Sequence, residues 1–262
     1  MADPWREVVN IGDATLYLGD AYEVIPALRS SFVRRETVCA MDPQYEFPAS
    51  GGGKLRKSRK YMDEIEDAGL AEGFDIRIID GPDDATWCAS AFVFFHNDQG
   101  PDIWPALSDR FERTALCAWR KKNPMPVANK HYMANLELYL HAWDGDHHPR
   151  GELKDKKRSF DGAVGKSDFD HPTVKPFALM KKIMINAAPG LIVDPFMGSG
   201  STGVAALAAG RRFIGVEINE RWFKIACKRL QWSLEPTKYE MPGKDDPAIT
   251  GEQVSLNLGS NA

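Results

Sequence analysis

A glycine-rich turn followed by an acidic residue is the strongest chemical pattern in this sequence of 262 residues. The stretch LIVDPFMGSGSTGVAALAAGRRFIGVEI (191–218) predicts a strand, a tight turn, a helix and a second strand that runs into Glu217. Glycines let such a turn bend sharply and approach a ligand closely. A carboxylate at the end of the second strand can accept hydrogen bonds from the ribose hydroxyls of an adenosine cofactor. The pattern therefore indicates a cofactor site.

Two kinds of cofactor compete for this turn. Gly198, Gly200 and Gly203 satisfy the G-x-G-x-x-G spacing of dinucleotide sites, so a nicotinamide oxidoreductase is one interpretation. Asp194-Pro195-Phe196 stands before the glycines, where a dinucleotide site usually runs straight from strand to first glycine, and this favours S-adenosylmethionine. No lysine follows Gly200, which excludes a phosphate loop of the Walker A type. A glycine turn without any ligand stays open as the structural alternative.

A second acidic turn follows another apolar run. Thr37–Met41 leads into Asp42-Pro43-Gln44-Tyr45. Asp-Pro is a common way to open a turn, so the residues by themselves also allow a purely structural role. The chemistry on offer is the activation of a nucleobase amine: a carboxylate and a neighbouring carbonyl accept its two N–H groups and favour its attack on a methyl group. An aromatic ring two residues after the proline can stack on the base.

Apolar runs that alternate with helical patterns must position these turns. Such alternation predicts βαβ units, a mainly parallel sheet and helices on both faces. The expected strands are 14–18, 37–41, 89–95, 114–119, 136–142, 191–193 and 213–216, and the expected helices are 21–29, 61–71, 103–111, 177–187, 202–209 and 220–230. We expect one catalytic domain over 1–234 with a basic loop at 50–60, a polar excursion at 144–170 with little regular structure, and a tail at 235–262.

The two turns together resemble the DNA amino-methyltransferases, which methylate N6 of adenine or N4 of cytosine. The resemblance rests on DPQY (42–45) and DPFMGSG (194–200), and their order is similar to the circularly permuted β group of that family. LYLGDAYEVIPAL (16–28), WRKKNPMP (119–126), the strand around Glu137 and HPTVKP (171–176) resemble further family segments in the same order. The match runs from about residue 14 to about residue 231.

The resemblance implies a Rossmann-like fold, S-adenosyl-L-methionine as cofactor, and transfer of its methyl group to a flipped-out base in DNA. It implies no metal. The catalytic residues it implies are Asp42, Pro43, Gln44 and Tyr45. The cofactor-binding residues it implies are Asp20, His171, Thr173, Lys175, Asp194, Pro195, Phe196, Gly198, Ser199, Gly200 and Glu217.

One position departs from the family pattern. Gln44 stands where a second proline is usual, so the turn loses stiffness. An Asp at the first position, Asp42, resembles the adenine enzymes more than the cytosine-N4 enzymes, where Ser is usual. We therefore expect adenine-N6 methylation. Cytosine-N4 methylation is the first alternative, and an impaired homologue that only binds DNA is the second.

The charge pattern bears on the DNA interface. Lys+Arg number 33 and Asp+Glu 37, a net charge of −4, so the basic footprint of a nucleic-acid binder must be local. We expect phosphate contacts from Lys54, Arg56, Lys57, Arg59, Lys60, Arg120, Lys121 and Lys122. The excursion at 144–170 is short, so we expect a short or relaxed target sequence.

Other partners and the cellular location are expectations of the same kind. No run approaches the length of a transmembrane helix and the N-terminus is not a signal peptide, so we expect no membrane partner and a cytoplasmic protein of a bacterium or of a virus in a bacterial host. A restriction endonuclease partner and a homodimer are further expectations.

Overall fold

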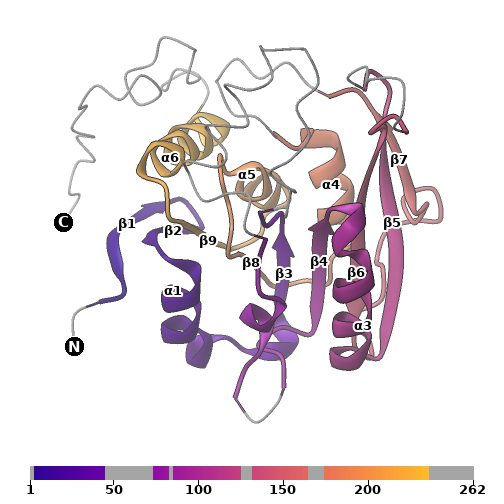
Figure 1. Ribbon diagram of the computed structural model, residues 1–262. Coiled ribbons are helices and arrows are strands. Elements are labelled where there is room, and N and C mark those ends of the chain that lie inside the picture. Colours follow the sequence, from indigo (N-terminus) through magenta and orange to yellow (C-terminus); the bar gives the residue numbers. More distant parts are fainter. Residues whose placement is uncertain (1–2, 45–72, 83–84, 125–131, 165–173, 236–262) are drawn as a thin grey trace.

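The computed structural model describes residues 3–44, 73–82, 85–124, 132–164 and 174–235 (Figure 1). These residues form a nine-stranded sheet in the order β1-β2-β9-β8-β3-β4-β6-β5-β7. The strands are β1 (Trp5–Ile11), β2 (Ala14–Gly19), β3 (Thr37–Met41), β4 (Ser90–Phe95), β5 (Arg113–Lys121), β6 (Leu136–Trp143), β7 (Ser159–Gly162), β8 (Leu191–Asp194) and β9 (Phe213–Glu217).

Five α-helices accompany the sheet in the described residues: α1 (Ala21–Leu28), α3 (Gly100–Arg110), α4 (Phe177–Asn186), α5 (Ser201–Ala208) and α6 (Glu220–Leu234). Single 3₁₀ turns lie at Arg29–Ser31, Arg34–Glu36, Ile76–Ile79 and Asn97–Gln99. The sequence-based strands and helices match these elements to within a few residues at most ends. The expected helix at 61–71 lies outside the described residues.

The sheet is parallel at its centre and mixed at its flanks. β2, β9, β8, β3 and β4 run parallel to one another. β1 pairs antiparallel with β2, and β6 pairs antiparallel with both β4 and β5. The expectation of a mainly parallel sheet is therefore confirmed for the centre. The chain order implied by the family resemblance, a circular permutation, stays a prediction.

Two edge strands were not expected from the sequence. β1 and β7 each pair with one neighbour, β2 and β5 respectively. β7 lies inside the excursion at 144–170, where Ser159 pairs with Ala118, so the expectation of little regular structure there is corrected. An edge strand buries at most part of its surface, and most residues of β7 are exposed or half-buried, so its sequence carries no strong apolar signal.

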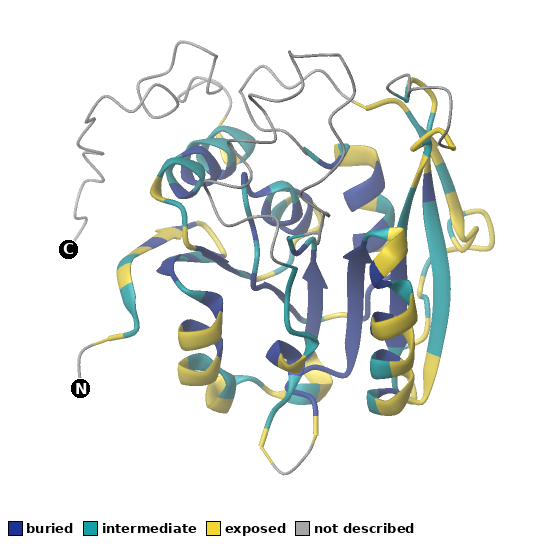
Figure 2. Ribbon diagram, viewed as in Figure 1, coloured by how far each residue is buried: buried dark blue, intermediate teal, exposed yellow. Residues whose placement is uncertain are grey.

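Alternating side chains of the central strands build a core on each face of the sheet. In β3, Val38 and Ala40 join one cluster, whereas Cys39 and Met41 join the other. The first cluster includes residues of α4, α5 and α6; the second includes residues of α1 and α3. Figure 2 shows these central strands buried between the helices. Burial on both faces explains why the central strands are continuous apolar runs.

The carboxyl ends of the parallel strands meet at one edge of the sheet, where ligands of open α/β sheets bind. Glu217 ends β9 and Asp194 ends β8, while Asp42 follows β3 directly. Asp20 follows β2 and caps α1. The order β2-β9-β8-β3 therefore lines up four carboxylates, from segments far apart in the sequence, along this edge.

Candidate active site

The glycine turn joins β8 to α5 as expected. Gly198 and Gly200 have φ angles of 51° and 80°, in the left-handed region that favours glycine. Gly200 is the N-cap of α5, and its missing Cβ allows Leu230 and Ala226 of α6 to pack against the turn. The turn therefore needs glycine at this position both for its backbone conformation and for its contact with α6.

Two carboxyl groups at this turn are buried. Asp194 accepts a hydrogen bond from the Phe196 amide at 3.0 Å, and Glu217 accepts one from the Asn219 amide at 2.7 Å. Burial raises the pKa of Glu217 to about 7. Burial also raises the pKa of Asp194 to about 7, and the nearby charges of Asp42 and Glu217 add to this rise. The three acidic groups therefore form one electrostatically linked site, which favours a ligand that carries positive charge or hydroxyl donors.

Arg229 of α6 donates hydrogen bonds to the glycine turn, a contact that was not expected from the sequence. Its guanidinium donates to Ser199 Oγ at 2.9 Å and to Ser201 Oγ at 3.2 Å. Burial lowers the pKa of Arg229 to about 10. The only sequence signal was a basic residue on the apolar side of an amphipathic helix, which is uncommon unless the residue is paired.

Lys175 links the second acidic turn to β6. Its Nζ pairs with Asp42 Oδ2 and, at 2.6 Å, with Glu137 Oε1. The other oxygen of Glu137 pairs with Lys121 Nζ at 2.8 Å. Glu137 was not among the site residues expected from the sequence, although a lone carboxylate in the otherwise apolar start of β6 was a usable signal.

Glu137 and Lys175 stay charged despite their burial. Burial raises the pKa of Glu137, but the charges of Lys175 and Lys121 and their hydrogen bonds outweigh it, so the pKa lies below its ordinary value. Burial lowers the pKa of Lys175, but Asp42 and Glu137 more than offset it and raise the pKa. The result is a chain of alternating charges that ends at Asp42.

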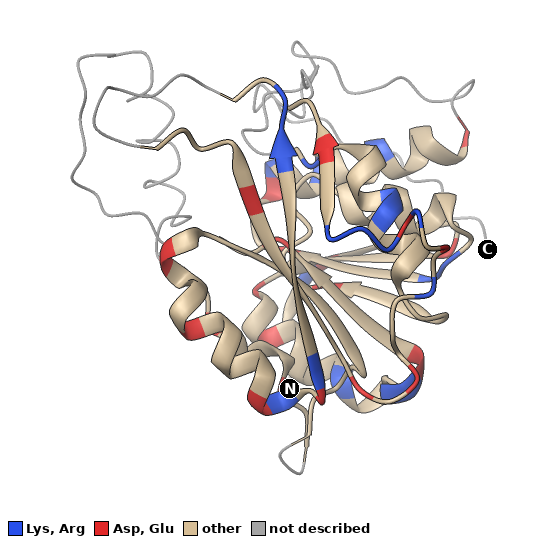
Figure 3. Cartoon of the chain, turned by 90° about the vertical axis from the view of Figure 1, so that its right-hand side faces the viewer, with Lys and Arg blue, Asp and Glu red and all other residues tan. Residues whose placement is uncertain are grey.

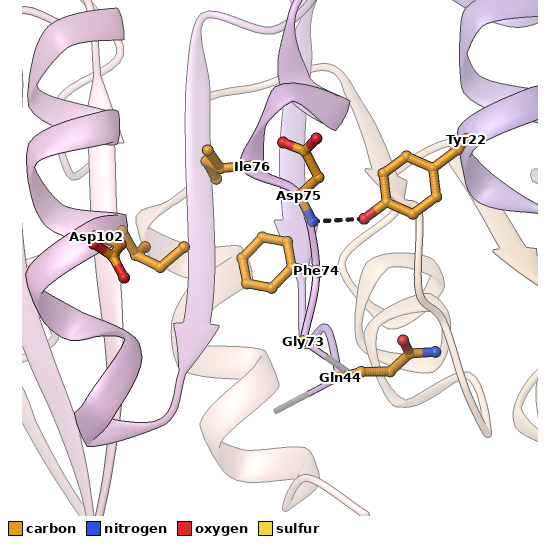
Figure 4. Close-up of a pocket in the computed structure, with 8 residues that line it drawn as sticks. Tyr22, Gln44, Gly73, Phe74, Asp75, Ile76 and Asp102 are labelled. Atoms are coloured by element: carbon orange, nitrogen blue, oxygen red, sulfur yellow. Dashed lines mark hydrogen bonds between the residues drawn. The ribbon is translucent and has the colours of Figure 1, made fainter. Parts of the chain in front are cut away.

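A pocket of about 610 Å³ opens beside Gln44. Figure 4 shows Gln44 and Tyr22 on one side of Phe74, and Asp102 on the other. Tyr22 Oη accepts a hydrogen bond from the Asp75 amide at 2.7 Å. The ring of Phe196, from the glycine turn, lies 6.0 Å from that of Tyr22 and 6.1 Å from that of Phe74, between ring centroids. The pocket thus adjoins both acidic turns and has aromatic walls.

Several expected site residues can be placed and others cannot. Asp20 accepts from the Tyr22 amide at 2.8 Å as the cap of α1, and Pro43 is buried. Arg120 pairs with Asp161 at 2.6 Å, and Lys121 forms the ion pair with Glu137 described above. Lys122 is exposed. Tyr45, Lys54, Arg56, Lys57, Arg59, Lys60, His171 and Thr173 lie outside the described residues.

No group of histidine, cysteine, aspartate and glutamate side chains suited to a metal ion occurs among the described residues. His141 stacks on Phe92 with ring centroids 4.0 Å apart, and burial lowers its pKa to about 3. His147 instead contacts the carbonyl of Arg35, 2.8 Å from its Nε2. In the same described part of the chain, no helix is long and apolar enough to cross a membrane.

The sheet order, the glycine turn and the acidic strand ends define an α/β protein of the Rossmann-like type. Comparison with solved structures agrees: the chain is similar to the M1.HpyAVI–SAM complex with a TM-score of 0.56 and 23% identity, over 82% of this chain and 99% of that one. This likeness concerns the fold.

The family model for DNA methylases matches residues 92–228, just over half of the chain. The chain belongs to this family. It is 49% identical over 119 residues to the DNA adenine methyltransferase YhdJ of Escherichia coli (strain K12), over 44% of this chain and 34% of that protein. It is 36% identical over 131 residues to the type II methyltransferase M2.DpnII of Streptococcus pneumoniae, over 43% of this chain and 49% of that protein. The matched part spans half or less of each of these two relatives.

Proposed function

We propose that this chain transfers a methyl group from S-adenosyl-L-methionine to the N6 amine of adenine in DNA. The observation that carries the proposal is the placement of Asp42, at the end of β3, beside the glycine turn at the end of the neighbouring strand β8. Membership of the DNA methylase family supports it.

The donor set fits the cofactor. S-adenosylmethionine carries hydroxyl and amine donors and a positive sulfonium, and the site offers buried carboxyl acceptors at Glu217 and Asp194. Glu217 would hold the ribose, Asp20 would lie near the adenine, and Asp194 to Gly200 would enclose the methionine part. When bound, the cofactor supplies an electrophilic methyl group.

The chain's own residues would prepare the amine. Asp42 and the carbonyl of Pro43 would accept its two N–H groups, which directs the nitrogen lone pair toward the methyl carbon. As the new N–C bond forms, the bond between the methyl carbon and the sulfonium sulfur breaks and leaves a neutral thioether. The nitrogen gains positive charge, which the Asp42 carboxylate would stabilise until the nitrogen releases a proton to solvent. The ring of Tyr45 would stack on the flipped base.

The first-position Asp and the relative named as an adenine methyltransferase favour adenine over cytosine. Cytosine-N4 methylation remains the alternative, since the family model covers both kinds of amine. One relative is named as a type II methyltransferase, and this supports the proposal that a restriction endonuclease acts together with this chain. A short target sequence, a homodimer and a cytoplasmic location stay predictions.

Asp42→Ala tests the assignment. We expect methyl transfer to fall by about 10²–10³-fold because a preorganised acceptor is lost. Cofactor binding should persist, because Glu217 and the glycine turn are unchanged. The assay uses defined DNA, tritiated cofactor and mass spectrometry of the product nucleosides, which also separates N6-methyladenine from N4-methylcytosine.

Asp109→Ala is the control, since Asp109 is exposed on α3. Full activity of Asp42→Ala would refute the assignment of Asp42. A wild-type chain that binds cofactor and DNA without any turnover would support the impaired homologue instead.

A further inference from the structure

The buried ammonium of Lys175 is shared between two carboxylates. Lys175 Nζ pairs with Asp42 Oδ2 and with Glu137 Oε1, and the lysine side chain is only 5% exposed. The ring of Phe94 in β4 lies beneath it, with its centroid 4.9 Å from Nζ. Lys175 therefore lies at the carboxyl edge of the sheet, over the ends of β3 and β4 and against the start of β6.

Glu137 is itself fixed in place. Its side chain is 11% exposed, and its second oxygen pairs with Lys121 of β5 at 2.8 Å. β5 and β6 are paired neighbours, with Trp119 opposite Glu137. Both partners of Glu137 are thus held by the sheet or by burial, so Glu137 can act as a rigid support for the Lys175 ammonium.

This arrangement has no clear value for stability alone. Burying charges costs solvation energy, and buried ion pairs often contribute little net stability. They do fix geometry when every member is paired. Asp42 begins a turn that lacks the second proline, because Gln44 stands there. A carboxylate on a less rigid turn needs another constraint to keep one orientation, and Lys175 supplies a contact to one of its two oxygens.

We propose that Lys175, supported by Glu137, is a positioning residue that fixes the plane of the Asp42 carboxylate for acceptance of the target amine. This inference rests on the proposed function. It assigns Lys175 a role different from the cofactor contact that the family resemblance implies. Lys175 would not touch the base and would act only through Asp42.

Positioning and simple electrostatics make opposite predictions for the loss of Lys175. The amine nitrogen gains positive charge as it takes up the methyl carbon and before it releases its proton. A nearby ammonium opposes that charge, so removing it should speed the reaction if charge alone mattered. If the ammonium instead holds Asp42 in place, its removal should slow the reaction, because small misplacements of a reacting group are costly.

Three variants test the proposal: Lys175→Met, Lys175→Arg and Glu137→Gln. For Lys175→Met we expect the kcat of methyl transfer to DNA to fall by about 100-fold. We expect its Kd for S-adenosylmethionine, measured by calorimetry, to stay within about threefold of wild type, because the proposal leaves the cofactor contacts intact. Lys175→Arg keeps a cation beside Asp42 and should recover about a tenth of wild-type kcat or more. Glu137→Gln should lower kcat about tenfold without weakening cofactor binding.

Lys182→Met is the matched control. Lys182 is a half-buried lysine of α4 whose Nζ donates to the backbone carbonyls of Asp155 and Lys157. Lys182→Met makes the same side-chain change at a lysine that does not contact Asp42, so kcat should remain near wild type. Urea unfolding of each variant shows whether it is folded at the assay temperature.

Two results would overturn the proposal. Weaker cofactor binding in Lys175→Met with unchanged kcat at saturating cofactor would make Lys175 a cofactor ligand. Unchanged or faster kcat in Lys175→Met would exclude positioning. If Lys175→Met does not fold, unchanged kcat in Glu137→Gln has the same meaning. Failure of the proposed function looks different, since wild type itself would then transfer no methyl group.

Discussion

At the scale of single residues, Glu217 combines two opposing demands. The residue is 7% exposed, and burial raises the pKa of its carboxyl group to about 7. Backbone amides, among them that of Asn219, donate to it and partly stabilise the charged form. A site that must accept hydroxyl donors needs an acceptor in this place, even though burying a carboxylate costs stability. Function and stability therefore conflict at this position.

Glu217→Gln should show that conflict. We expect the affinity for S-adenosylmethionine to fall about tenfold, because a charged acceptor is lost. Calorimetry measures this. Glu220→Gln is the control, since Glu220 lies on the surface of α6 with its side chain 57% exposed. Equal cofactor affinity in Glu217→Gln and wild type would remove Glu217 from the proposed ribose site.

The difference in stability between wild type and Glu217→Gln should depend on pH with a defined sign. The folded-state pKa of Glu217 is raised from 4.5 to about 7, so the folded chain binds more protons than the unfolded chain between these values. Wild type should therefore lose stability relative to Glu217→Gln as the pH rises from 4 to 8. Urea unfolding of both proteins at several pH values measures the difference, and a difference independent of pH would contradict the raised pKa.

At the scale of elements, the contact between the glycine turn and α6 sets the geometry of the cofactor site. A Cβ on Gly200 would lie 2.9 Å from Leu230 Cδ1 and 3.1 Å from Ala226 Cβ. Arg229 of the same helix binds Ser199 and Ser201. α6 begins about 20 residues after the turn, and α5 and β9 lie between them in the sequence. The helix therefore supports a turn that it contacts in space but does not adjoin in the sequence.

Gly200→Ala should destabilise the chain by about 2–4 kcal/mol, from left-handed strain and overlap together. Gly210→Ala is a matched control: Gly210 has a φ of 67°, and a Cβ there would have no neighbour within 4 Å. We expect it to cost only about 1–2 kcal/mol. Urea unfolding measures both, and calorimetry should show weaker cofactor binding for Gly200→Ala alone. Equal losses in the two variants would mean that α6 does not shape the turn.

At the scale of the whole molecule, the net charge of −4 limits how DNA can be held. Many described cations have acidic partners: Arg34 pairs with Asp144, Arg110 with Asp80 and Arg120 with Asp161. On the face turned to the viewer in Figure 3, the loop before β7 is mostly basic, whereas α3 carries mainly acidic residues. Phosphate contacts must therefore be few and local, and Lys122 is an exposed candidate among the described residues.

We expect DNA binding to weaken with salt, with a slope of log K against log salt of about −2 to −5, because each neutralised phosphate contributes about −0.9. Fluorescence anisotropy with a labelled duplex across a salt series measures it. Lys122→Ala should reduce the slope, whereas Arg120→Ala should change it less because Arg120 is paired with Asp161. Affinity that is independent of salt would contradict the picture of a local basic surface.

The sequence by itself determined the parallel centre of the sheet and the identity of both acidic turns. Buried parallel strands are continuous apolar runs, and a glycine turn needs glycine, so both features are visible in local residue types. The edge strands β1 and β7 were missed, because a strand paired on one side has no such constraint. Family resemblance supplied further cofactor candidates, including Lys175, and the charge pattern supplied the candidate DNA contacts.

Only the tertiary structure decided how the two turns are supported. Lys121, Glu137 and Lys175 come from separate segments, and no local pattern relates them to Asp42. The same holds for Arg229 behind the glycine turn. The physical reason is that ion pairs and supporting contacts depend on distance in space, which the order of strands in the sheet sets, and that order is not written in any one stretch of sequence.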